Sequence, residues 1–131
     1  MNTTTMTKVL GGGFLAIGIL GFIPAMTPDG RLFGIFPVNA MHNVVHLAFG
    51  VWGLLAANSA TASTLYGRAV AIGYVLLALL GLIPATSTLF GLVPLDGPDV
   101  VLHLVLALVG AYIGWSHRVA YQPPREQRHP I

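Results

Sequence analysis

The stretch LFGIFPVNAMHNVVHL (32–47) decides the fold, because the chain repeats it without a gap as LFGLVPLDGPDVVLHL (89–104). Further upstream, GFIPA (21–25) has a counterpart in GLIPA (81–85). The offset is 60 residues for the upstream pair and 57 for the downstream pair, so the first copy carries three additional residues between its two blocks. The chain therefore consists of two related segments.

The repeat places titratable residues at matching positions. His46 aligns with His103, and His42 aligns with Asp99. All four lie in or beside strongly apolar sequence, where ionisable side chains are costly and tend to mark functional sites. The repeated histidine is therefore the first candidate for function.

Composition indicates a membrane protein. The 131 residues are 55% hydrophobic and 8% charged, whereas about 25% of residues are charged in a typical soluble domain. The mean hydropathy is +0.79. A helix crosses a hydrocarbon core of about 30 Å with roughly 20 residues. Four stretches are suitable, near 8–25, 40–57, 68–85 and 98–115.

These stretches predict an all-α membrane protein with four transmembrane helices. They form a single four-span domain (1–117) built from two helical-hairpin repeats, about 8–58 and 66–117. Since both hairpins begin on the same side, the repeats are parallel, with a pseudo-two-fold axis along the membrane normal. The remaining residues, 118–131, are expected to form a disordered, basic cytoplasmic tail.

Charge distribution predicts the orientation. A net charge of +2 is too small to suggest a nucleic-acid partner, and we expect the lipid bilayer as the main partner. All but one of the cationic side chains, Arg31, fall on one side of the four-span arrangement: Lys8, Arg68, Arg118, Arg125 and Arg128. By the positive-inside rule, both termini of this multi-pass protein are cytoplasmic and the histidines lie toward the extracytoplasmic side.

The connection inside each repeat is unusually apolar for a loop. We expect these LFG loops to pack back onto the mouth of the bundle or to lie among the lipid headgroups. Asn39 and Asp96 follow the loops at positions where a side-chain oxygen can cap the next helix.

Small residues follow each histidine at helical spacing, which places them on the same helix face as that histidine. They are Gly50, Gly53 and Ala57 below His46, and Ala107, Gly110 and Gly114 below His103. Because small residues let membrane helices approach closely, we expect the second and fourth spans to pack along these two faces. Their histidines would then face each other.

Three imidazoles and one carboxylate would meet at that contact: His42, His46, Asp99 and His103. This set suits a divalent transition metal such as zinc, copper or iron. The same groups could instead bridge the helices by hydrogen bonds alone. Asn43, Asn39 and Asp96 are expected to surround and orient the four residues.

Other functions stay open at this stage. Bis-histidine haem in an electron-transfer subunit is an alternative, although close helix contact leaves little room for a porphyrin. Proton or small-solute transport would require an oligomer. An enzyme is less expected, because the chain has no cysteine and no carboxylate pair at catalytic spacing. A non-enzymatic protein, acting alone, as a homo-oligomer or as an accessory subunit of a larger membrane complex, fits best.

The segments HNVVHLAFGVWGLLA (42–56) and DVVLHLVLALVG (99–110) resemble a bacterial membrane-protein family known as domain of unknown function 4383. The resemblance implies a four-span bundle in a bacterial cytoplasmic membrane, with an H-N-x-x-H motif in the second span and a D-N-x-x-H motif in the fourth. These motifs fall on His42, Asn43, His46, Asp99 and His103. Val100 departs from the pattern where the family usually has asparagine.

Overall fold

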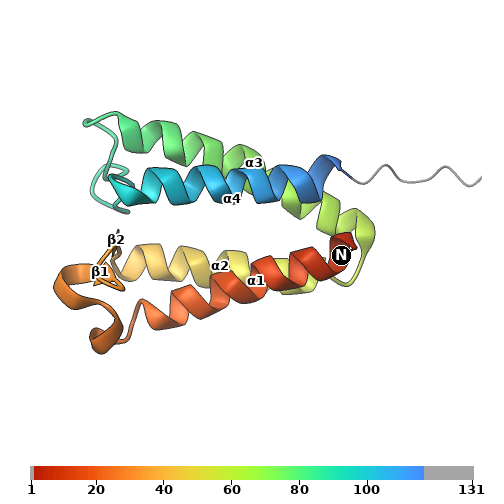
Figure 1. Cartoon of the computed structure of the whole chain (residues 1–131), viewed down its shortest axis with the longest axis horizontal. Coiled ribbons are helices and arrows are strands. Elements are labelled where there is room, and N and C mark those ends of the chain that lie inside the picture. Colours follow the sequence, from red (N-terminus) through yellow and green to blue (C-terminus); the bar gives the residue numbers. More distant parts are fainter. Residues whose placement is uncertain (1, 117–131) are drawn as a thin grey trace, which may run out of the picture.

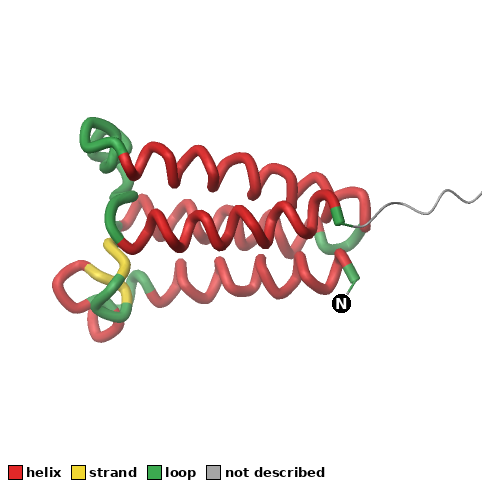
Figure 2. Tube along the Cα trace, turned by 45° about the horizontal axis from the view of Figure 1, so that its top comes forward, coloured by secondary structure: helices red, strands yellow, loops and turns green. Residues whose placement is uncertain are grey.

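The computed structural model describes residues 2–116, and these residues form two helical hairpins. Helices α1 (Thr3–Leu20) and α2 (Ala40–Ala56) make the first, and α3 (Ala60–Leu82) and α4 (Pro98–Trp115) make the second. The hairpins lie one above the other in Figure 1, with the loop inside each hairpin at the end opposite the N-terminus. Figure 2 shows the same bundle rotated by 45° about the horizontal axis and coloured by secondary structure. The expected tail, 118–131, lies outside the described residues.

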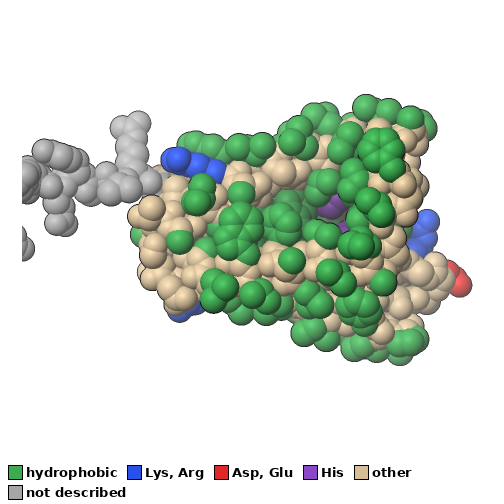
Figure 3. All heavy atoms as spheres, turned by 180° about the vertical axis from the view of Figure 1, so that it is seen from behind, with side chains coloured by type: hydrophobic (Ala, Val, Ile, Leu, Met, Phe, Trp, Pro, Cys, Tyr) green, Lys and Arg blue, Asp and Glu red, His purple; other side chains and the backbone are tan. Residues whose placement is uncertain are grey.

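The described part of the chain is all-α apart from one two-stranded turn. Three of its helices, α1, α3 and α4, are long and apolar enough to cross a membrane, while the apolar α2 has 17 residues. Large hydrophobic side chains point outward, and Leu108 is 71% exposed. They cover much of the face shown in Figure 3. Such an extensive apolar exterior is unusual for a protein surrounded by water.

Two helix boundaries differ from the expected spans. Helix α1 begins at Thr3 rather than near residue 8, because the Asn2 side chain accepts a hydrogen bond from the Thr5 amide at 2.8 Å. Helix α3 begins at Ala60 rather than near residue 68, because Ser59 caps it in the same way. Both helices end a few residues earlier than predicted, ahead of the Ile-Pro pair that disfavours helix.

One of the two expected helix caps is confirmed. Asn39 caps α2, and its side-chain oxygen accepts a hydrogen bond from the His42 amide at 2.8 Å. The prediction for Asp96 is wrong, because Gly97 takes the N-cap position of α4 with φ of 64° and no side-chain cap. A left-handed backbone at this position favours glycine, and it leaves the Asp96 carboxylate exposed.

The two LFG loops differ in secondary structure but share the backbone conformation of one Phe-Gly pair. In the first loop, the 3₁₀ turns η1 (Pro24–Met26) and η2 (Pro28–Gly30) precede strands β1 (Arg31–Leu32) and β2 (Phe36–Pro37), which pair antiparallel. The Phe-Gly pair that follows the repeated leucine has positive φ in both copies: Phe33 55°, Gly34 73°, Phe90 58° and Gly91 87°. The pseudo-two-fold symmetry of the whole bundle remains a prediction.

Small residues bring the two helices of each hairpin together. A Cβ atom placed on Gly53 would lie 2.9 Å from Gly11 Cα in α1. One placed on Gly110 would lie 2.7 Å from the Ala71 amide nitrogen in α3. The backbones therefore approach closely within hairpins, α1 against α2 and α3 against α4.

The predicted contact between the small faces of the second and fourth spans is therefore wrong. Gly50 meets Leu15 of α1, and Gly114 meets the backbone of Arg68 in α3. Ala57 and Ala107 are buried, and Ala107 belongs to the core described next. Spacing along one helix shows which residues share a face, but it does not show which neighbour that face meets.

The hairpins meet through larger side chains. Their shared core contains Phe14, Ala56, Tyr66, Val70, Tyr74 and Ala107. The Phe14 and Tyr74 rings stack with centroids 5.5 Å apart, and the Tyr66 hydroxyl donates a hydrogen bond to the Phe49 carbonyl at 3.0 Å. Contacts between hairpins are fewer than contacts within them, so the interface between hairpins has room for a site.

Gly110→Ala tests the close packing within a hairpin. We expect it to destabilise the protein by about 1–3 kcal/mol, because the added methyl group would overlap the α3 backbone. Gly73→Ala is the control, since a Cβ at Gly73 meets no atom within 4 Å among the described residues. It should stabilise α3 by up to about 1 kcal/mol through helix propensity. Unfolding in mixed detergent micelles measures both, and equal effects would contradict this packing.

Candidate functional site

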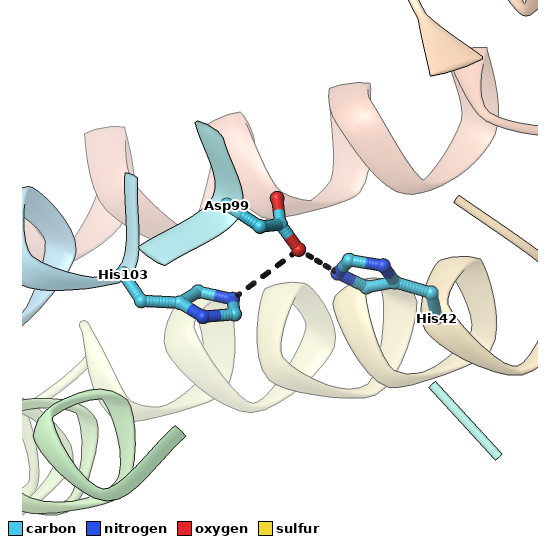
Figure 4. A group of neighbouring side chains, drawn as sticks. All are labelled: His42, Asp99 and His103. Carbon is cyan, nitrogen blue, oxygen red and sulfur yellow. Dashed lines mark ion pairs between the residues drawn. The ribbon is translucent and has the colours of Figure 1, made fainter. Parts of the chain in front are cut away.

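Three titratable side chains from the two hairpins converge near the loop end of the bundle. His42 lies in α2, and Asp99 and His103 lie in α4 (Figure 4). The Asp99 Oδ2 atom is 3.8 Å from His42 Nε2 and 3.9 Å from His103 Nε2. One ligand atom from each of the three residues can be chosen so that all lie within 4.8 Å of one another. We call these residues the His/Asp cluster.

Local structure fixes the cluster. Asn39 caps α2 and so places His42 in the first turn of the helix. Pro98 occupies the first turn of α4, a position that suits proline, and it is followed by Asp99. The spacing of four residues between Asp99 and His103 puts both side chains on one face of α4.

The cluster is buried and incompletely hydrogen bonded. His42, Asp99 and His103 are 3%, 1% and 2% exposed. Within residues 2–116, Asp99 Oδ2 and His103 Nδ1 have no hydrogen-bond partner. Buried polar atoms are nearly always paired, so two such atoms in one place suggest that a ligand completes the site.

His46 lies beside the cluster but outside the group of three. Its ring packs 4.5 Å from the His42 ring and 5.7 Å from Phe14, centroid to centroid. We expected His46 to face His103. The α2 histidine whose ring contacts the His103 ring is instead His42, with ring centroids 6.4 Å apart. The physical reason is the packing described above: the face of α2 below His46 meets α1. His46 Nδ1 also has no partner within the described residues.

The three residues expected to surround the site have different positions. Asn39 donates a hydrogen bond to the Leu92 carbonyl at 2.9 Å and thus joins the two loops, whereas Asp96 is exposed. Asn43 is buried against Gly21, close enough that a Cβ on that glycine would overlap it. Its counterpart Val100 packs in the same way over Gly81. At this position the side chain therefore fills space beside a glycine.

Two aromatic rings below the histidines were not predicted as part of the site. Phe14 packs against His46, and Tyr74 packs edge-on against His103 with centroids 5.2 Å apart. Phe14 and Tyr74 stand 60 residues apart, the offset of the first repeat block. That correspondence is the sequence feature that could have identified them.

The loops cover the cluster. This agrees with the expectation that they pack back onto the mouth of the bundle. Leu32 and Leu95 are 4% and 1% exposed, and Val93 is also buried. Two cavities remain beside the cluster. One, of about 60 Å³, lies among α2, α3 and the second loop, and Figure 3 shows histidine atoms at the bottom of a hollow on this face. The other, of about 390 Å³, lies between α1 and α4.

The arrangement suits coordination of a metal ion. Zinc binds imidazole nitrogen and carboxylate oxygen at about 2.0–2.2 Å, which puts tetrahedral ligand atoms about 3.4 Å apart. The two His to Asp distances exceed this value by about 0.5 Å, and all three ligand atoms lie within 4.8 Å of one another, so the side chains would have to move closer together around a bound ion. Three ligands leave a fourth position for water or another donor.

Comparison with known proteins identifies the family. The family described as domain of unknown function DUF4383 matches residues 4–116. Curated proteins and solved structures give no match. The matched region includes all four helices except the first residue of α1, and it contains the whole His/Asp cluster. The chain therefore belongs to the DUF4383 family.

Proposed function

We propose that this protein is an integral membrane protein in which His42, Asp99 and His103 bind one divalent transition-metal ion. The observation that carries the proposal is the buried, unpaired Asp99 carboxylate oxygen between two imidazoles. A buried ionic group without adequate partners is strongly unfavourable. A cation coordinated there would supply the missing interaction.

The ion would join the two halves of the molecule. His42 belongs to the first hairpin, and Asp99 and His103 belong to the second. Since direct contacts between the hairpins are sparse, a bond from each hairpin to one ion would add a strong link between them. We therefore propose a binding or structural role, alone or as a subunit of a larger membrane complex, rather than catalysis.

The proposed orientation places the ion toward the extracytoplasmic side of a bacterial cytoplasmic membrane. The cluster lies at the loop end of the bundle, opposite the N-terminus (Figure 1). Lys8 and Arg68 lie toward the other end, and positive charge favours the cytoplasmic side. Both termini would then be cytoplasmic.

Haem and transport receive less support. The Asp99 carboxylate lies between the His42 and His103 rings (Figure 4), where a porphyrin held by both histidines would have to lie. A transport path needs polar groups that continue across the bundle. On the face of α4 below His103 the residues are instead small, as Ala107 and Gly110 illustrate. The buried Tyr66 hydroxyl is occupied by a hydrogen bond to the Phe49 carbonyl.

Metal content tests the proposal directly. Purified full-length protein, loaded with zinc and desalted, should retain about one ion per chain by elemental analysis. His42→Ala and His103→Ala should each lose most of it, because each removes one of three ligands. His46→Ala is the matched control, since His46 lies outside the group. Equal retention by all variants would contradict the assigned site.

Stability in the presence of zinc provides a second test. A ligand that binds only the folded state stabilises it by about 2.7 kcal/mol at 100 times its Kd, so zinc should raise the melting temperature and a chelator should reverse the change. Asp99→Asn should abolish this response. In metal-free protein the same variant should be at least as stable as the wild type, because the amide removes a buried carboxylate without adequate partners. A large loss of stability without metal would instead indicate a purely helix-bridging role.

A further inference from the structure

The larger cavity forms a long groove with two different ends. It is lined along α1 from Met6 to Ile17 and along α4 from Asp99 to Val109. Ten residues of helix span about 15 Å, so the 390 Å³ are distributed along an elongated space. The groove borders the outside of the bundle, where Val9 is 63% exposed. A molecule could therefore enter it sideways from the surrounding lipid.

Polarity is confined to the loop end of this groove. His42, His46 and Asp99 lie there, and the rest of the lining is apolar. His46 Nδ1 and Asp99 Oδ2 have no hydrogen-bond partner within the described residues. The groove therefore offers hydrogen bonding to one end of a ligand and hydrocarbon contact to the remainder.

Aromatic side chains surround the polar end. Phe33 and Phe36 come from the first loop, and Phe14 contacts the His46 ring. Aromatic rings pack favourably against other flat rings, either offset and parallel or edge-on. Aliphatic residues, including Met6, Leu10 and Val109, line the opposite end. This distribution fits a flat polar ring attached to a hydrocarbon chain.

We infer that the groove between α1 and α4 binds a lipid quinone, with a ring carbonyl near His46 and the isoprenoid or alkyl tail along α1 and α4. The inference relies on the membrane location proposed above, but it does not rely on metal binding, because His46 lies outside the group of three. The inference concerns quinone binding and includes no reaction of the quinone.

The charge of the residues that line the groove favours a neutral quinone over negatively charged lipids. The described lining residues include no lysine or arginine, and one of them is Asp99. A phosphate headgroup or a fatty-acid carboxylate would face that carboxylate without a compensating cation, which is unfavourable. A long-chain alcohol is neutral but has no ring to pack against the phenylalanines. A neutral quinone brings no negative charge to the Asp99 carboxylate, and its ring can pack against the phenylalanines.

The groove can be blocked at Gly13. This residue lines it, and a Cβ placed on Gly13 meets no described atom within 4 Å. A leucine at this position should therefore fill the groove without disturbing the fold. Gly12→Leu is the matched control, because Gly12 has the same freedom and is not part of the lining.

The experiment uses full-length protein in lipid nanodiscs, titrated with a decyl-substituted benzoquinone by equilibrium dialysis, with empty nanodiscs as background. We expect saturable binding at one site per chain. Gly13→Leu should weaken binding by about tenfold or more, which corresponds to about 1.4 kcal/mol, and Gly12→Leu should bind as the wild type does. His46→Phe should also weaken binding, because it removes the unpaired ring nitrogen and keeps the ring.

Three results would overturn the inference: no saturable binding, equal binding by the two leucine variants, or equal affinity for the benzoquinone and for decanol. Zinc content measured on the same samples separates this inference from the metal proposal, since Gly13→Leu should retain the ion. Leu106→Phe narrows the groove from α4. It replaces Gly13→Leu if that variant does not fold, as judged by its circular dichroism.

Discussion

Close backbone contact within each hairpin is the constraint on which the rest of the structure depends. Gly11 against Gly53, and Gly110 against Ala71, set the two pairs of helices so near each other that a methyl group would not fit at the key positions. Some small residues also face the other hairpin, since Gly53 lies against the Tyr66 hydroxyl and Ala107 belongs to the shared core. The hairpins are joined by a shared core that contains aromatic rings, by the hydrogen bond from Asn39 to the Leu92 carbonyl and by the His/Asp cluster.

The cluster thus lies at the interface between the hairpins, beside two cavities. Asp99 is buried between two imidazoles at distances too long for hydrogen bonds. An arrangement of this kind stabilises a fold poorly unless something bridges it. The cavities on both sides reach His42 and His46, so the proposed metal site and the proposed quinone groove both belong to this one interface between the hairpins.

Much of the architecture could be predicted from the sequence, because apolar length and an internal repeat are properties of the chain itself. The bounds of α4, the capping by Asn39 and the placement of Asp99 and His103 on one face of α4 follow from local rules. The proximity of His42 to these two residues depends on how the two hairpins pack. Which helix each small face meets could not be predicted, since faces on all four helices contain glycine or alanine. The predicted inclusion of His46 in the site rested on that same mistaken helix contact, and the group of three does not contain it. The contribution of Phe14 and Tyr74 depends on contacts between hairpins, which periodicity along one helix does not reveal.

The length of α2 has a consequence for the surrounding bilayer. Its 17 residues cover about 25 Å, less than a hydrocarbon thickness of about 30 Å. A segment this short is accommodated by local thinning of the membrane or by flanking residues that reach toward the interface. Because α2 starts two residues before His42, thinning at this end of the helix would bring the membrane surface closer to the imidazoles and to the ion proposed to bind there.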